Sequence, residues 1–219
     1  RKLSKVCSFY RLTKDAVKEC LQYLDQSTRV ADERSHSLEE VFSLETMALE
    51  WQIPELLPKG ETVILAGSPK VGKTLLSIDA AFSVATGESS FLGEAVKRGR
   101  VLLVTCDESL RSTKNKLIRR GFRLQDQDWI RVLPKWHISQ VGLLEAELED
   151  YRPDVVIVDS LKRVTSGSQV SENSAEFADS IYTLKETIGR YNASGILIHH
   201  TNKSPDAMGV GKLRGSSAI

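Results

Sequence analysis

The chain has few cysteines and few aromatic residues, and it has no long hydrophobic run. Its three cysteines, Cys7, Cys20 and Cys106, are scattered, and no two of them form a C-x-x-C pair. An odd set of this kind indicates reduced thiols and argues against a disulfide framework or a zinc site. Because no apolar run approaches the length that spans a bilayer, and the basic start lacks the apolar core of a signal peptide, we expect a cytoplasmic protein without a membrane partner.

The sequence also has almost no net charge, no internal repeat and no low-complexity tract. Thirty Lys and Arg residues face 29 Asp and Glu residues, which gives a formal charge of +1. This balance neither requires nor excludes a nucleic-acid partner, so any basic surface must be local. A hydrophobic content of 41% is enough for a buried core. Since the chain lacks an initiator Met and stops abruptly at Ile219, we expect it to be a piece of a longer protein.

Residues 1–35 are predicted to form a helical extension and a linker. Thr13 can cap a short helix with apolar residues on one face, and the stretch from Gln26 to His36 is almost wholly charged and polar. We expect a surface helix or an inter-domain connector, with a contact to nucleic acid or to a neighbouring subunit as the alternative. The main domain then covers residues 36–219.

The main domain alternates strands with helices. A capping-box pattern of Ser37 and Glu40 indicates a first helix, residues 49–53 alternate like an edge strand, and the core begins near Lys59. The expected core strands cover 62–66, 101–105, 129–133, 155–158 and 195–199, and the expected helices cover 74–86, 109–121, 139–151 and 174–193. This order predicts an α/β fold with a mostly parallel twisted sheet and helices on both faces. Ligands of such sheets bind at the carboxyl ends of the strands.

The most informative stretch is the loop after the first core strand. It reads Gly67-Ser68-Pro69-Lys70-Val71-Gly72-Lys73-Thr74, a full G-x-x-x-x-G-K-[ST] pattern between a strand and a helix, and Leu75 follows it. Glycines at both ends let the backbone aim successive N–H groups at phosphates. We expect this loop and Leu75 to bind the nucleotide, with Lys73 on the β and γ phosphates and the Thr74 hydroxyl on Mg²⁺.

Two carboxylates at strand ends add to this prediction. Asp159 follows four β-branched residues, in the position where nucleotide hydrolases place a carboxylate that holds Mg²⁺ through water. Many P-loop motors have a catalytic glutamate directly after it, but this chain has Ser160, so the base must come from elsewhere. The second core strand ends in Cys106-Asp107-Glu108 and can lie beside the strand of the phosphate loop. We therefore expect Glu108 to activate the attacking water, whereas Asp107 is expected to cap the next helix.

The fourth long apolar strand ends in His199-His200-Thr201-Asn202-Lys203, where a polar side chain can face the γ phosphate. Neighbouring residues of a strand point to opposite faces, so one histidine is expected to be packed. The alternation favours His200 as the exposed residue that senses the γ phosphate. Metal binding by the histidine pair is not expected, since the two side chains diverge and no third ligand has a suitable spacing.

Together, these placements resemble the RecA-like P-loop ATPase superfamily, and within it the hexameric helicase branch of RepA-type plasmid replication helicases and relatives of DnaB and KaiC. The resemblance covers about residues 51–219. It depends on the loop from Gly67 to Thr74, on Glu108, on Asp159 followed by Ser160, and on the polar runs 199–203 and 212–217. It implies a RecA-like fold, ATP and Mg²⁺ as ligands, and an ATPase.

The resemblance further implies a hexameric ring in which nucleotide sites lie between subunits. Arg214 matches the arginine finger position best, and Lys212 assists it. The loops 161–173 and 202–214 are implied to face a central channel and to grip single-stranded DNA. Neither loop has an aromatic residue, so such a grip is mainly electrostatic. The sheet is expected to lack its last strands, because the chain ends before them.

Several functions remain open from the sequence. The leading one is a replicative helicase that hydrolyses ATP to move on or unwind single-stranded DNA. A KaiC-like regulatory ATPase or autokinase is a second, with Ser160, Ser166 and Ser168 as available acceptors. A recombinase-like filament that uses ATP to organise DNA is a third. A GTPase switch is disfavoured, because the Asp of an N-K-x-D motif after Asn202 falls one residue late.

Overall fold

The computed structural model describes residues 35–43, 50–87, 90–165 and 175–200. Contacts divide the chain into two compact units, residues 1–48 and 49–219; the predicted boundary after residue 35 stays a prediction, and the helix predicted after Thr13 lies outside the described residues. In the first unit, the described part forms helix α3 (Leu38–Ser43). The predicted capping box precedes it, because Ser37 N–H donates to Glu40 Oε2 (2.8 Å) and Glu40 N–H donates to Ser37 Oγ (3.1 Å).

The second unit is built on a five-stranded sheet in which every pairing is parallel. Each apolar run predicted from the sequence forms one strand, with bounds within one residue of those expected. The strands are β3 (Thr62–Gly67), β4 (Val101–Thr105), β5 (Ile130–Pro134), β6 (Val155–Asp159) and β7 (Ser194–His200). The predicted α/β fold with a RecA-like arrangement of the P-loop core is therefore confirmed.

The order of the strands corrects one expectation. The sheet runs β3-β7-β6-β4-β5, so the strand that carries the phosphate loop pairs with β7, and β4 lies two strands further away. The prediction that β4 lies beside β3 is wrong. Two strands, β7 and β6, lie between β3 and β4. Asp107 and Glu108, which follow β4, are therefore separated from the phosphate loop by the carboxyl ends of those two strands.

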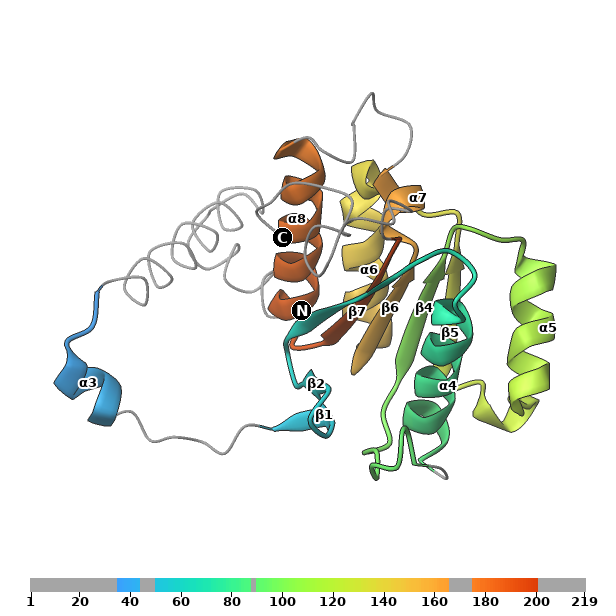
Figure 1. Ribbon diagram of the computed structural model, residues 1–219, viewed down its shortest axis with the longest axis horizontal. Coiled ribbons are helices and arrows are strands. Elements are labelled where there is room, and N and C mark those ends of the chain that lie inside the picture. Colours follow the sequence, from blue (N-terminus) through green and yellow to red (C-terminus); the bar gives the residue numbers. More distant parts are fainter. Residues whose placement is uncertain (1–34, 44–49, 88–89, 166–174, 201–219) are drawn as a thin grey trace, which may run out of the picture. The chain divides into compact units, whose positions relative to one another are not determined.

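Helices cover both faces of this sheet (Figure 1). α4 (Lys73–Thr86) and α5 (Leu110–Arg120) lie on one face, and α6 (Val141–Tyr151), α7 (Leu161–Thr165) and α8 (Ala175–Arg190) lie on the other. Alternate residues of β4 face the two layers: Leu103 packs in the cluster that contains Ile78 of α4, and Leu102 packs in the cluster that contains Leu144 of α6. Both faces of β4 and β6 are buried, which is why these two strands read as continuous apolar runs.

Two expectations about local structure need refinement. The predicted edge strand forms as β1 (Trp51–Ile53), but it pairs with β2 (Leu57–Pro58) in a separate antiparallel hairpin rather than at the edge of the main sheet. The predicted loop after Ser160 begins with the helix α7, and its residues 166–173 lie outside the described ones. Short 3-10 turns precede β5 (Leu124–Asp126) and α6 (Ile138–Gln140). In the described ranges, no helix is long and apolar enough to cross a membrane.

Helix α5 has well-defined ends. Ser109 caps it, since its Oγ accepts a hydrogen bond from Ser112 N–H (3.2 Å). Gly121 ends it with a φ of +119°, a conformation that favours glycine, and donates its N–H to carbonyls of the last turn. The helix predicted from Ser109 to Gly121 is thus confirmed.

Candidate nucleotide-binding site

The predicted phosphate loop joins β3 to α4 and has the backbone that an anion site needs. Gly72 stands at the start of α4 with a φ of +96°, and among the described residues no side chain caps the first turn of that helix. Its N–H groups therefore remain available to an anion. Gly67 matters for a different reason, because a Cβ there would lie 3.3 Å from Val71 Cγ2 and 3.6 Å from Lys73 Cδ. The two glycines give the loop its tight path.

Lys73 folds back over this loop. Its Nζ donates to the carbonyl oxygens of Gly67 (2.8 Å) and Ser68 (2.9 Å). Burial lowers the pKa of Lys73, although the charges of Asp159 and Asp107 act in the opposite direction. Lys73 is only 7% exposed, so its ammonium has little contact with water. Its predicted role as a ligand of the β and γ phosphates stays a prediction.

Thr74 and Asp159 form the second polar pair of the site. Thr74 Oγ1 donates to Asp159 Oδ2 at 2.7 Å, which joins the first turn of α4 to the end of β6. Asp159 is only 5% exposed. Burial raises the pKa of Asp159, the hydrogen bond from Thr74 lowers it, and the charge of Asp107 raises it further. A hydroxyl and a carboxylate placed together are oxygen donors of the kind that Mg²⁺ prefers.

A cleft of about 710 Å³ opens between the phosphate loop, α4 and α5. Several predicted residues line it, together with the basic residues of the second half of α5; the predicted ones are Lys70, Gly72, Lys73, Thr74, Leu75 and His200. His199 is 2% exposed, whereas the side chain of His200 is 24% exposed. The alternation of packed and accessible histidines at the end of β7 is thus confirmed.

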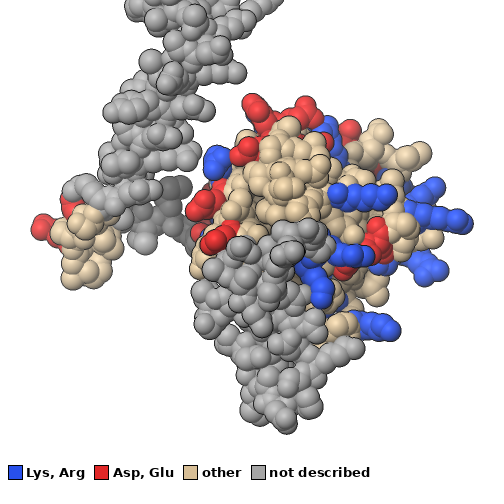
Figure 2. All heavy atoms as spheres, turned by 90° about the horizontal axis from the view of Figure 1, so that it is seen from above, with Lys and Arg blue, Asp and Glu red and all other residues tan. Residues whose placement is uncertain are grey.

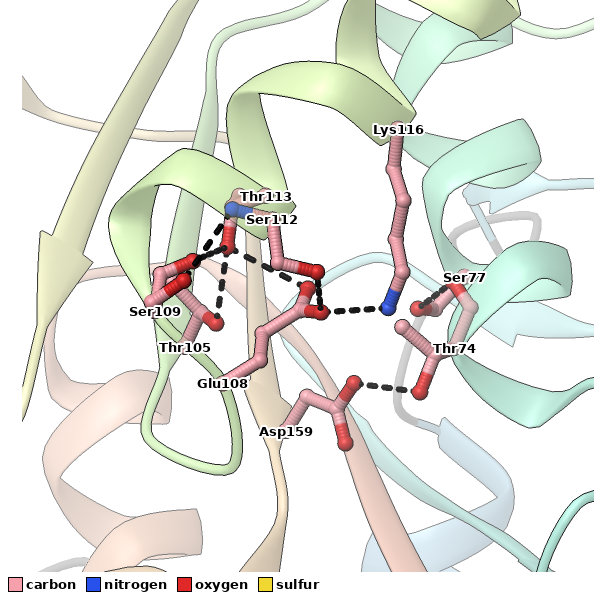
Figure 3. A network of polar contacts seen from close by, with 9 residues as sticks. All are labelled: Thr74, Ser77, Thr105, Glu108, Ser109, Ser112, Thr113, Lys116 and Asp159. Carbon is pink, nitrogen blue, oxygen red and sulfur yellow. Dashed lines mark hydrogen bonds and ion pairs between the residues drawn. The ribbon is translucent and has the colours of Figure 1, made fainter.

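Glu108 contacts three residues of α5, one of which, Lys116, lines this cleft (Figure 3). Its carboxylate accepts hydrogen bonds from Ser112 Oγ (2.6 Å), Thr113 Oγ1 (3.2 Å) and Lys116 Nζ (2.6 Å). Burial alone would raise the pKa of Glu108, but the hydrogen bonds from Lys116 and Ser112 and the charge of Lys116 outweigh it and lower the pKa. Lys116 itself lines the cleft, a position that was not predicted from the sequence.

Asp107 makes contacts that the sequence does not predict. Its carboxylate accepts hydrogen bonds from Ser160 Oγ (3.0 Å) and from Arg163 Nε (3.1 Å), and it lies 3.5 Å from His200 Nε2. This one side chain connects the ends of β4, β6 and β7. It does not cap α5 as expected, because Ser109 does so. The available signal was its place just beyond the end of a core strand, which it shares with Ser160.

The structure thus brings most of the predicted site residues together at the carboxyl ends of the strands. Gly67, Ser68, Pro69 and Val71 complete the loop around the lining residues, and Asp159 and Glu108 adjoin them. Arg214 and Lys212 lie outside the described residues. The roles of all these residues stay predictions.

A comparison with protein-family models identifies the chain. The model of a family described as AAA domain matches residues 28–206, which is most of the sequence. The chain belongs to this family. An AAA domain is a nucleotide-hydrolysing module of the P-loop ATPase superfamily, so the predicted nucleotide binding and ATPase activity are confirmed at this level. No curated protein matches the sequence.

Proposed function

We propose that this AAA domain hydrolyses ATP with Mg²⁺ at subunit interfaces and uses the energy to move on or unwind single-stranded DNA. The observation that carries the hydrolytic part is the hydrogen bond between Thr74 and Asp159 beneath the phosphate loop, with Glu108 and His200 at the same strand ends. These groups come from α4, β6, β7 and the loop after β4, and together with the phosphate loop they supply a phosphate cradle, oxygen donors and a carboxylate.

In this proposal each residue has a separate task. Lys73 and the first turn of α4 bind the β and γ phosphates. Thr74 and Asp159 hold the magnesium ion, which supplies positive charge to the triphosphate when it is bound. Glu108 orients and deprotonates the attacking water, and His200 contacts the γ phosphate. Arg214 of a neighbouring subunit completes the site in a hexameric ring.

Support for a DNA-dependent role comes from helix α7. This helix follows Asp159 and Ser160 directly and carries two basic residues, Lys162 and Arg163. Arg163 donates to Asp107, which also contacts the ends of β6 and β7. A change at the γ phosphate could therefore be transmitted through His200 and Asp107 to α7, whose basic residues can contact a nucleic-acid backbone.

The decisive experiment measures the ATPase rate with and without single-stranded DNA, on protein of known oligomeric mass, together with strand separation. We expect DNA to accelerate hydrolysis. Lys162→Ala should weaken DNA binding. It should also reduce the slope of log binding constant against log salt concentration by about one unit. Lys185→Ala is the matched control, because Lys185 pairs with Glu61 at the amino-terminal edge of β3 (3.4 Å). Hydrolysis without any response to DNA would contradict the helicase proposal and leave the ATPase intact.

The regulatory alternative has one testable feature in the described residues. Ser160 is fully buried and donates to Asp107, so it is poorly placed to accept a phosphoryl group. Ser166 and Ser168 lie outside the described residues. Transfer of labelled phosphate from ATP to the protein would favour the autokinase over the motor.

A further inference from the structure

We propose that Lys116 of α5 is a γ-phosphate ligand, and that in the absence of ATP it is held by Glu108. This inference rests on the proposed ATPase function and adds a residue that lies outside the phosphate loop. Its consequence is that ATP, but not ADP, separates Lys116 from Glu108. The same event that binds the γ phosphate then frees the carboxylate that is proposed to activate water.

The position of Lys116 is the first argument. Its Nζ lies 2.6 Å from Glu108 Oε2, and the two side chains are 29% and 17% exposed. It lines the same cleft as Lys73, Thr74 and His200. Figure 3 shows its side chain extending from α5 toward Glu108 and the pair formed by Thr74 and Asp159. The charge of Lys116 also lowers the pKa of Asp159, which is consistent with its closeness to the expected metal site.

The hydrogen-bonding capacity of the pair is the second argument. Glu108 receives two further hydrogen bonds, from Ser112 and Thr113, so its carboxylate stays in place without the lysine. An ammonium has three N–H donors, and among the described residues Lys116 uses one of them, on Glu108. Lys116 therefore retains donors for a phosphate oxygen. A terminal phosphate, with more than one negative charge, is a stronger partner than a single carboxylate.

The neighbours of Lys116 on α5 supply the third argument. Arg120, one turn later, pairs with Asp79 of α4 and lies over the ring of Phe82 at 4.1 Å. These contacts fix α5 against α4 and occupy the Arg120 guanidinium. Figure 2 shows Lys and Arg side chains gathered on the side of the surface that α5 forms. Lys116 differs from the other basic residues of α5 because its ammonium contacts the proposed base.

The test compares affinities for ADP and for a non-hydrolysable ATP analogue, measured by calorimetry on the 219-residue chain with Mg²⁺. Lys116→Gln should weaken binding of the analogue about tenfold or more and change ADP binding by less than about twofold. Lys116→Arg should retain most of the preference for the analogue. Lys114→Gln is the matched control, because Lys114 is exposed on the same helix and lies in the groove on its other side, toward Leu124.

A second measurement uses Glu108 as the competitor. Glu108→Gln should strengthen binding of the ATP analogue several-fold, since Lys116 no longer has to leave a carboxylate. This gain should vanish when Lys116→Gln is also present, because the two changes act on one interaction. Thermal denaturation without nucleotide confirms that each variant is folded.

The outcomes separate this inference from the proposed function. If Lys116→Gln keeps the wild-type ratio of the two affinities, Lys116 is not a γ-phosphate ligand and the inference is wrong, whereas the ATPase proposal stands. Equal losses for ADP and the analogue would indicate a structural role and would also overturn it. If the wild-type chain binds neither nucleotide, the proposed function itself fails.

Discussion

At the scale of single residues, the site depends on charges that the fold keeps away from water. Burial lowers the pKa of Lys73 and raises the pKa of Asp159, so the charged form of each is less favourable than it would be in solvent. A phosphate next to Lys73 and a cation next to Asp159 would each restore that lost stabilisation. The two residues proposed to bind the ligands therefore make the folded protein less stable when no ligand is present.

Removing the ammonium of Lys73 should abolish nucleotide binding. Lys73→Ala deletes the donor that now contacts two loop carbonyls and leaves the backbone of the loop in place. We expect a fall in ATP affinity below the detection limit of calorimetry, with an unchanged circular dichroism spectrum. Normal affinity in this variant would mean that nucleotide binds elsewhere.

Neutralising Asp159 should raise the stability of the metal-free protein and abolish its Mg²⁺-dependent activity. Because burial and the charge of Asp107 disfavour the carboxylate, Asp159→Asn should stabilise the metal-free protein by about 1 kcal/mol, or roughly 2–4 °C in Tm. The same variant should lose Mg²⁺-dependent hydrolysis. Asp128→Asn, at an exposed position, serves as the control for both measurements. A lower Tm for Asp159→Asn would contradict the argument from burial.

Glu108→Gln should bind ATP and fail to hydrolyse it. Its effect on stability has a defined sign. Since the pKa of Glu108 is lowered from 4.5 in the folded protein, the carboxylate stabilises the fold above that value, and this contribution is lost as the pH falls through the lowered pKa. The difference in Tm between the wild type and Glu108→Gln should therefore shrink as the pH is taken from neutral to below 4.5. Normal turnover would refute the assignment of Glu108 as the base.

At the scale of elements, the helices and strands of the described core and their approximate bounds could be predicted from the sequence. Which strands lie next to one another could not. Runs such as residues 155–158 read as buried strands because both of their faces are covered. An apolar run does not specify which strands lie next to it in the sheet. The separation of β3 and β4 by two strands could therefore not be predicted. Lys116 was missed because every basic residue of α5 looks alike in a polar helix. Its spacing from Glu108 and Ser112, four residues at each step, was the signal that could have found it.

The contact between β3 and β7 can be tested with two glycines. Gly195 faces Thr62 in the register, and a Cβ there would lie 2.5 Å from Thr62 Oγ1. Gly195→Ala should destabilise the protein by about 1–3 kcal/mol and reduce nucleotide affinity, because it displaces the strand before the phosphate loop. In contrast, apart from its chain neighbours and the backbone of its own helix, no atom of the described residues lies within 4 Å of a Cβ placed on Gly142 in α6, and Gly142→Ala should stabilise the protein by about 0.5–1 kcal/mol. Chemical denaturation measures both changes; equal stability of the two variants would contradict this account.

At the scale of the whole molecule, the proposed ring can be tested by mixing variants. Arg214→Ala should leave the subunit folded and impair hydrolysis only in the assembly, since its proposed target is the site of a neighbour. Lys73→Ala subunits keep Arg214 and lack a working loop, so a mixture of the two inactive proteins should recover part of the ATPase rate. Activity that stays absent in the mixture, while both variants assemble, would mean that Arg214 does not act on the site of a neighbouring subunit.

The pairing of β3 with β7 also has a consequence for synthesis. Among the described strands, β3 pairs only with β7, and Thr62 meets Gly195 far along the chain. On the ribosome, the strand that leads into the phosphate loop has to wait for its partner until nearly all of this domain has been translated. We therefore expect a nascent chain to bind nucleotide only after β7, its last described strand, has emerged from the exit tunnel.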